Sequence, residues 1–262
     1  MTTRSKVIIV KGSNRERMVE NGLKALEINP YKEKVVIKPN LITNRPYPVT
    51  TSPKTVECIV NYFKGKAKEI FIAEGSGMCR GGTPKAFLDL GYSELAEKSG
   101  LKLVDLNEDD YELRKNPEAL KLKEFKFPLT LKNSFLISAA VLKRHSMAKV
   151  TLSLKNMMGA STGRRKARFH LLGITKSIVD LNLYKKPDLA LIDGIESSSR
   201  ELGGEVTRYD LMILSKDPVA ADAVGANILG LNPLSVPHIK LAQEKGLGIA
   251  RREEIEMEEI KV

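Results

Sequence analysis

Cysteine, histidine and tryptophan are scarce in this chain of 262 residues, which has two cysteines, three histidines and no tryptophan. The cysteines, Cys58 and Cys79, form no Cys-x-x-Cys pair, which argues against a disulfide framework, a structural zinc site and a self-ligated iron–sulfur cluster. No apolar run approaches the roughly 20 residues that a membrane span requires. The first segment, MTTRSKVIIVKG, has a short apolar run without a small-residue cleavage site. We therefore interpret it as a β-strand, and we expect a cytoplasmic protein that does not contact a membrane.

Acidic residues are almost absent from residues 140–186, which hold 11 Lys or Arg and the single acid Asp180. This basic block accounts for most of the net charge of +11. Such a block attracts anions, which include phosphate esters, carboxylates, nucleic acid and acidic proteins. The alternative is a basic surface without a ligand, as on other lysine-rich proteins.

Short β-branched runs alternate with longer helical patterns, which is typical of a parallel sheet covered by helices. The predicted strands are residues 6–11, 34–38, 69–73, 101–105, 135–141, 188–193 and 209–215, with a β-excursion over 121–131 and an edge strand over 254–262. The predicted helices are residues 15–26, 53–63, 84–99, 148–157, 172–182, 218–229 and 235–245. We expect an α/β fold with a mostly parallel open sheet and helices on both faces, in a single domain over residues 1–262. Two closely packed lobes that meet near residues 107–118 are the alternative.

Lys38 and Asn40 follow the second predicted strand at its carboxyl end. In open parallel sheets, ligands bind in the crevice beyond these ends. Thr51 and Ser52 precede a predicted helix at Pro53, where hydroxyl and backbone N–H groups can meet an anion. We interpret Lys38, Asn40, Thr51 and Ser52 as ligand-binding residues. A turn followed by a helix cap without a ligand is the alternative.

A glycine-rich turn, Glu74-Gly75-Ser76-Gly77, lies between a predicted strand and a predicted helix. Successive glycine amides can form an anion-binding concavity, so we interpret all four residues as ligand-binding. The spacing fits neither a P-loop nor a dinucleotide-binding fingerprint. A flexible loop that closes over a pocket is the alternative.

The basic block holds the candidate catalytic residues. His145 and His170 are candidates because imidazole exchanges protons near neutral pH. Lys155 lies in an apolar stretch beside Asn156, where a lysine faces either water or an anion, and burial would make it a base or a nucleophile. Asn156 and Arg165, the latter from an arginine-rich loop, are predicted ligand-binding residues. For the arginines, a solvated loop is the alternative.

One acidic residue, Asp193, ends the predicted strand LALID at the same edge of the sheet. We interpret it as a ligand-binding residue that orients a polar group of the ligand. Carboxylates at strand ends also bind divalent metals. No histidine accompanies the acids here at ligand spacing, so the sequence predicts no metal site, and bound magnesium is the alternative.

Six ordered motifs extend over nearly the whole chain: VVIKPNLI, TSP, AEGSG, TLSLKNMMG, LIDGIES and DPVAADAVGANILGLNP. Together they resemble the family called domain of unknown function 362. The resemblance implies a mixed α/β fold and one site that contains Lys38, Asn40, Lys155, Asn156 and Asp193, without assigning roles to them. Some members resemble fusions to ferredoxin-type domains, which implies electron transfer. This chain has no cysteine cluster, so a redox step would need a separate, acidic ferredoxin-like protein.

The sequence leads to three hypotheses and identifies no cofactor. The first is an enzyme or binding protein for an anionic small metabolite, with a redox step through an external electron-transfer partner as one version. The second is nucleic-acid binding through the basic block, which is less favoured because the block contains few aromatic residues for stacking on bases. The third is a scaffold or assembly factor.

Overall fold

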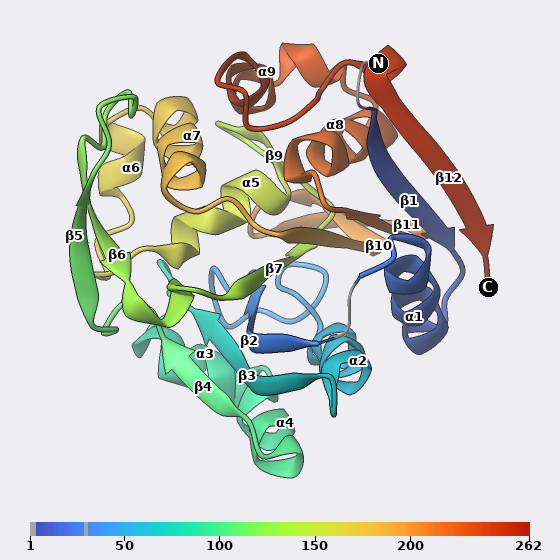
Figure 1. The fold of residues 1–262 in the computed structure, drawn as a ribbon, viewed down its shortest axis with the longest axis horizontal. Coiled ribbons are helices and arrows are strands. Elements are labelled where there is room, and N and C mark those ends of the chain that lie inside the picture. Colours follow the sequence, from blue (N-terminus) through green and yellow to red (C-terminus); the bar gives the residue numbers. More distant parts are fainter. Residues whose placement is uncertain (1–3, 29–30) are drawn as a thin grey trace.

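The computed structural model of the protein describes residues 4–28 and 31–262. Within these residues, the main sheet has the strand order β12-β1-β11-β10-β7-β2-β3-β4 (Figure 1). Its strands are β1 (Ser5–Lys11), β2 (Lys32–Pro39), β3 (Ala67–Glu74), β4 (Lys102–Asp105), β7 (Phe135–Val141), β10 (Leu189–Arg200), β11 (Gly203–Ser215) and β12 (Ile255–Lys261). Neighbouring strands are parallel except around β11, which is antiparallel to β1 and β10. The mixed α/β fold with a mostly parallel sheet is thereby confirmed, as is the edge strand at the end of the chain.

Helices cover both faces of the sheet (Figure 1). One face carries α1 (Arg15–Ala25), α2 (Pro53–Phe63), α3 (Gly82–Asp89) and α4 (Tyr92–Ser99). The other carries α5 (Ser153–Asn156), α7 (Ile174–Tyr184), α8 (Pro218–Ile228) and α9 (Pro237–Glu244). Successive strand residues point to opposite faces, so that Val36 and Ile37 belong to two different apolar cores. No helix in the described ranges combines the length and the apolar character needed to cross a membrane.

Shorter elements complete the described structure. Two hairpins lie outside the main sheet: β5 (Tyr111–Lys115) with β6 (Glu124–Pro128), and β8 (Lys143–His145) with β9 (Lys149–Thr151). The remaining turns are α6 (Arg168–Leu171) and the 3₁₀ turns η1 (Leu129–Leu131), η2 (Met157–Ala160), η3 (Pro233–Ser235) and η4 (Arg252–Glu254). Strand β5 lies within the polar stretch 107–118.

Two predicted helices differ from the structure. The helix predicted over residues 84–99 is broken into α3 and α4, because Gly91 adopts a left-handed φ of 81°. The helix predicted over 148–157 is wrong in its first half, where residues 149–151 form β9 and pair with β8. Only its second half is helical, as α5. The apolar run there fits a buried strand as well as a buried helix, and periodicity alone does not separate the two.

The order in which the chain adds strands to the sheet changes direction between the neighbouring strands β2 and β7. These strands are neighbours, yet the chain continues from β2 to β3 and β4, and from β7 to β10 on the opposite side. The first connection passes through α2 on one face, and the second passes through α5 and α7 on the other (Figure 1). Connections that diverge in this way leave a crevice at the carboxyl ends of the strands, where α/β proteins bind ligands.

Candidate functional site

A cavity of about 320 Å³ lies at this point of the sheet. The residues predicted from sequence that line it are Lys38, Asn40, Glu74, Gly75, Gly77, His145, Lys155, Asn156 and His170. Other lining residues include Lys143, Lys166 and Glu201, together with Ile42, Met78, Met147, Met158 and Leu202. The cavity therefore has a largely cationic polar lining between apolar side chains.

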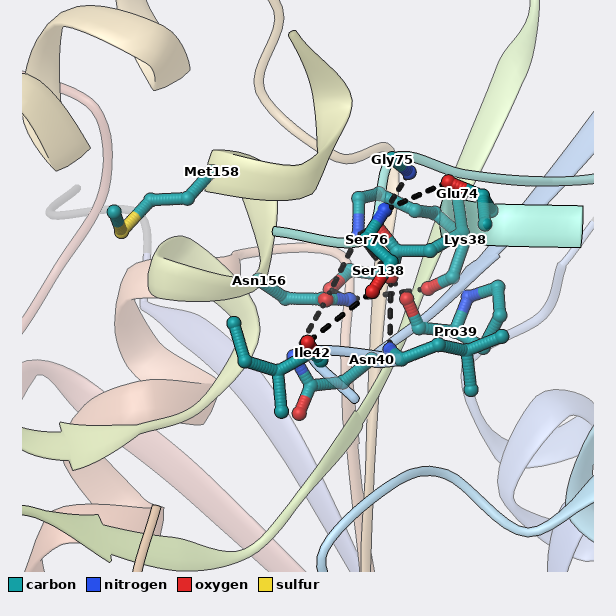
Figure 2. Close-up of polar contacts among 12 residues, drawn as sticks. Lys38, Pro39, Asn40, Ile42, Glu74, Gly75, Ser76, Ser138, Asn156 and Met158 are labelled. Carbon is teal, nitrogen blue, oxygen red and sulfur yellow. Dashed lines mark hydrogen bonds and ion pairs between the residues drawn. The ribbon is translucent and has the colours of Figure 1, made fainter. Parts of the chain in front are cut away.

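Lys38 and Glu74 form a buried ion pair at the carboxyl ends of β2 and β3. Lys38 is fully buried, and its ammonium donates to both carboxylate oxygens of Glu74 at 2.9 Å. The same ammonium donates to Asn156 Oδ1 at 2.9 Å and to the carbonyl of Pro39 at 3.0 Å (Figure 2). Burial lowers the pKa of Lys38, and the carboxylate of Glu74 opposes this shift. All of these acceptors belong to the protein, and the ligand-binding role of Lys38 stays a prediction.

The glycine-rich turn after β3 is built around Glu74. The amide of Gly75 donates to Glu74 Oε1 at 2.7 Å, and the amide of Ser76 donates to the hydroxyl of Thr83 at 3.0 Å. A Cβ atom on Gly159 would overlap the Glu74 carboxylate, and one on Gly75 would come within 2.7 Å of the Gly159 carbonyl. The glycines here therefore allow two chain segments to approach the ion pair closely. The amides of residues 75 and 76 are used within the protein.

Asn156 joins this ion pair to the neighbouring strand β7. Its amide nitrogen donates to the Lys38 carbonyl and to the Ser138 hydroxyl, both at 3.0 Å. Its carboxamide oxygen also accepts from Asn40 at 3.4 Å. Asn156 thus ties the end of α5 to the ends of β2 and β7, and the side chain is fixed on all sides (Figure 2).

Lys155 differs from the other lysines of the cavity. Its side chain is only 9% exposed, yet its ammonium has no hydrogen bond or ion pair with any residue in ranges 4–28 and 31–262. Burial lowers its pKa to about 8, and the charge of Glu201 opposes the shift. A largely buried cation without a partner destabilises a folded protein, because burial removes much of the water that would solvate it. Such an ammonium can bind an anion, and its neutral amine can act as a nucleophile.

Two buried side chains fix the short helix that carries Lys155. Asp222 of α8 is fully buried and accepts hydrogen bonds from the amides of Ser153 at 2.8 Å and Leu154 at 3.0 Å. Asn182 of α7 donates to the Leu154 carbonyl at 3.0 Å. Residues on both sides of Lys155 are thereby held in place. Burial raises the pKa of Asp222 to about 8, and the two backbone donors oppose this shift.

Lys143 and Lys166 add two further buried cations. The ammonium of Lys143 donates to the carbonyls of Val49 and Glu201, and that of Lys166 donates to the carbonyl and hydroxyl oxygens of Ser161. Burial lowers the pKa of each to about 7. For Lys143, the charge of Lys155 lowers the pKa further. An anion in the cavity would favour the charged forms of these lysines.

Both histidines of the cavity have lowered pKa values. His145 Nδ1 accepts from the amides of Met147 and Ala148 at 3.1 Å, which assigns its proton to Nε2. Burial, followed by the charge of Lys155, lowers the pKa of His145 to about 4. The same two causes lower the pKa of His170. The ring of His145 is therefore a neutral hydrogen-bonding group at pH 7, which differs from the titration near neutral pH expected from sequence.

Five residues that we predicted as ligand-binding lie outside the cavity lining: Thr51, Ser52, Ser76, Arg165 and Asp193. Asp193 is fully buried on the side of α1 and α2, where it accepts from Tyr47, Thr55 and the amide of Ile195. Thr51 links the amide of Asn40 to the carbonyl of Ala139. Arg165 is exposed on its loop. The strand end predicted at Asp193 is wrong, because β10 continues to Arg200 and the Asp193 side chain contacts the helix layer instead of the crevice.

Sequence reasoning did not select Lys143, Lys166 or Glu201. In β8, alternate residues point to the same side, so that Lys143 and His145 are buried while Arg144 is exposed. This alternation is the sequence pattern that could have indicated that Lys143 is buried beside His145. Lys166 follows two exposed arginines, and its burial has no local signal. Within the described parts of the chain, no three His, Cys, Asp or Glu side chains are grouped so that they could hold a metal ion.

The family profile described as Domain of unknown function (DUF362) matches residues 35–227, well over half of the chain. The chain belongs to this family. The matched range contains every residue that lines the cavity. A curated protein of Synechocystis sp., named as thylakoid-associated, is 25% identical over 235 residues, which cover 82% of this chain and 68% of that protein. No solved structure matches the chain.

Proposed function

We propose that the protein binds a small anionic molecule in the cavity, with Lys155 as the principal charged contact. The observation that carries the proposal is Lys155, which is only 9% exposed, lines the cavity and has no hydrogen-bond acceptor or ion-pair partner among the described residues. Lysine is almost never fully buried in proteins unless it is paired. An anionic ligand supplies the missing partner.

The charges around the cavity support an anion. Lys38 and Glu74 neutralise each other through their ion pair. Three buried lysines then remain, Lys143, Lys155 and Lys166, against the single lining carboxylate of Glu201. That carboxylate is itself bonded to Ser146 through a hydroxyl at 2.6 Å and an amide at 3.1 Å. A bound anion would therefore meet an excess of positive charge in a region where water screens it weakly.

The dimensions of the cavity favour a small ligand. Its volume of about 320 Å³ lies at the lower end of the range for small-molecule sites, roughly 300–1,000 Å³. Apolar side chains such as Ile42, Met158 and Leu202 form part of its lining. A small carboxylate or phosphate fits this combination of charge and size.

Burial within the basic block weakens the nucleic-acid alternative. Lys143, Lys155 and Lys166 belong to residues 140–186, and all three are buried. Arg164 is paired with Glu108, and Lys185 with Asp188. The charge that the block presents to solvent is therefore smaller than the sequence indicates, and phosphate contacts along a nucleic acid depend on exposed cations.

Calorimetric titration with inorganic phosphate, sulfate and malonate at pH 7 and low salt tests the proposal. Lys155→Met should weaken binding about tenfold or more, because a hydrogen bond to a charged group contributes roughly 1.5–3 kcal/mol. Lys176→Met is the matched control. Lys176 belongs to the same basic block but is exposed on α7, outside the cavity lining.

The control should bind the anions as the unchanged protein does. Equal weakening in both variants would mean that the anions respond to overall charge. Absence of binding by all three anions, or binding that Lys155→Met leaves unchanged, would contradict the proposal.

A further inference from the structure

We propose that Lys155 is a nucleophile that forms an imine with a small 2-oxo acid. The inference rests on the anion-binding function proposed above and specifies its substrate class. It starts from a comparison of the four buried lysines of the cavity. Three have ammonium groups bonded to protein acceptors, in Lys38, Lys143 and Lys166. Lys155 alone among these four has no bonded acceptor within the described residues.

Hydrogen bonds hold the residues on both sides of Lys155. Asp222 and Asn182 hold Leu154, the residue before it. Asn156, the residue after it, makes hydrogen bonds to Lys38, to Ser138 and to Asn40. The backbone that carries the amine is therefore held in place. A nucleophile has to meet a carbonyl carbon at a defined distance and direction, and a fixed backbone limits the positions that the amine can reach.

The neighbouring cations favour a carbonyl compound that also carries a carboxylate. Lys143 and Lys166 line the same cavity and keep their ammonium groups in place through bonds to carbonyl oxygens. A carboxylate held by these cations leaves an adjacent carbonyl group for the free amine of Lys155. The pKa of about 8 supports this chemistry, since about a tenth of the amine is unprotonated at pH 7.

The reaction is a reversible condensation without a change of oxidation state. The lone pair of the Lys155 amine attacks the carbonyl carbon, so that the C–N bond forms as the C=O π bond breaks. The former carbonyl oxygen takes up one proton from the amine nitrogen and a second from solvent. That oxygen then leaves as water, which gives the protonated imine. Hydrolysis reverses each step. The Nε2–H group of His145, which lines the same cavity, is a hydrogen-bond donor for the oxygen during the attack.

Reductive trapping tests the inference. The full-length protein is incubated with glyoxylate, pyruvate or 2-oxoglutarate and sodium cyanoborohydride, and the modified lysine is located by peptide mass mapping. We expect one reduced adduct at Lys155 that forms at least tenfold faster than adducts at exposed lysines such as Lys176. Malonate, which competes for the site without forming an imine, should suppress this adduct.

Two variants separate nucleophile from anion contact. Lys155→Arg retains the positive charge but forms no imine, so it should bind malonate and show no rapid trapping. If the larger side chain prevents folding, Lys155→Met provides the same test of trapping in a folded protein. Malonate binding by the unchanged protein without an adduct from any oxo acid would overturn the inference and leave the anion site intact. Absence of both binding and trapping would overturn both proposals, and equal trapping at Lys155 and at exposed lysines would overturn the inference alone.

Discussion

Two lysines of the cavity lining, Lys38 and Lys155, show how differently one residue type is used in the same cavity. Lys38 is fully buried with four hydrogen bonds to protein acceptors. Lys155 is nearly as buried, and its ammonium has no partner among the described residues. An ion pair inside a protein is destabilising to break, whereas an unpaired buried charge is destabilising to keep. The two residues should therefore respond in opposite ways to the same substitution.

Substitution by methionine makes this contrast measurable. Lys38→Met leaves the Glu74 carboxylate buried without its cation, and we expect a loss of roughly 3–5 kcal/mol in the free energy of unfolding. Lys155→Met removes an unpaired buried charge and should raise the free energy of unfolding by about 2 kcal/mol at pH 7. Urea unfolding of the ligand-free variants checks both values. Destabilisation by Lys155→Met comparable to that of Lys38→Met would show that Lys155 has a structural role.

His238 on α9 gives a prediction for acid stability. It is fully buried, neither ring nitrogen has a hydrogen-bond partner among the described residues, and burial lowers its pKa to about 3. The unfolded chain binds a proton here below about pH 6.5, while the folded chain does not until about pH 3. Stability is therefore highest above pH 6.5 and falls as the pH is lowered toward 3.

Comparison with His238→Phe isolates this contribution. Between pH 6.5 and pH 5, the unchanged protein should lose about 1.5 kcal/mol more than the variant, by the linkage between proton binding and unfolding. Urea unfolding at several pH values measures the difference. Parallel pH dependence in the two proteins would show that His238 can accept a proton in the folded state.

At the scale of elements, the short helix α5 depends on its neighbours for its position. It has four residues, and helices of that length are unstable by themselves. The carboxylate of Asp222 accepts from the amides of its first two residues, across a separation of 69 and 68 positions in the chain. This contact accounts for an acid in an alanine-rich helix, which a capping role within α8 does not explain.

Loss of this contact should affect ligand binding as well as stability. Asp222→Ala should lower the free energy of unfolding by about 2 kcal/mol and weaken malonate binding, because Lys155 is no longer held in place. Asp217→Ala is the matched control: Asp217 caps α8 by accepting from Val219 and Ala220. The control should lose stability without losing affinity for malonate, when affinity is measured under conditions in which both variants are fully folded. Unchanged affinity in Asp222→Ala would show that α5 keeps its position without the cap.

The main strands and most helices could be predicted because their signals are local. Runs of β-branched residues between turns mark the strands, and proline marks the start of α2 and α8. The elements that were predicted wrongly depend on contacts between segments, which local sequence patterns do not show. The hairpin of β8 and β9 forms through pairing between short segments, and a left-handed φ of 66° at Lys149 begins its second strand. No local pattern distinguishes this arrangement from the start of a helix.

At the scale of the whole molecule, the sequence predicted the location of the candidate site better than it predicted which residues line it. The rule that ligands bind at the carboxyl ends of parallel strands directed attention to Lys38, Glu74 and the segment after β7, and all three reach the cavity. We predicted Asp193 by the same rule, but it lies inside β10 and bonds to Tyr47 and Thr55 on the other face. Whether such a residue lines the cavity depends on how the helix layers pack against the sheet, which the sequence alone does not show.

The measurement that tests the central claim most directly is calorimetric titration of the protein with malonate at pH 8, in two buffers with different enthalpies of ionisation. At this pH, Lys143, Lys155 and Lys166, with pKa values of about 7, 8 and 7, are at least partly neutral. A dianion among them favours their charged forms, so binding should take up protons, on the order of one per malonate, and weaken as the pH rises further. Lys155→Met should reduce this uptake. Binding heats that are the same in both buffers, or an absence of binding, would contradict an anion site built on these lysines.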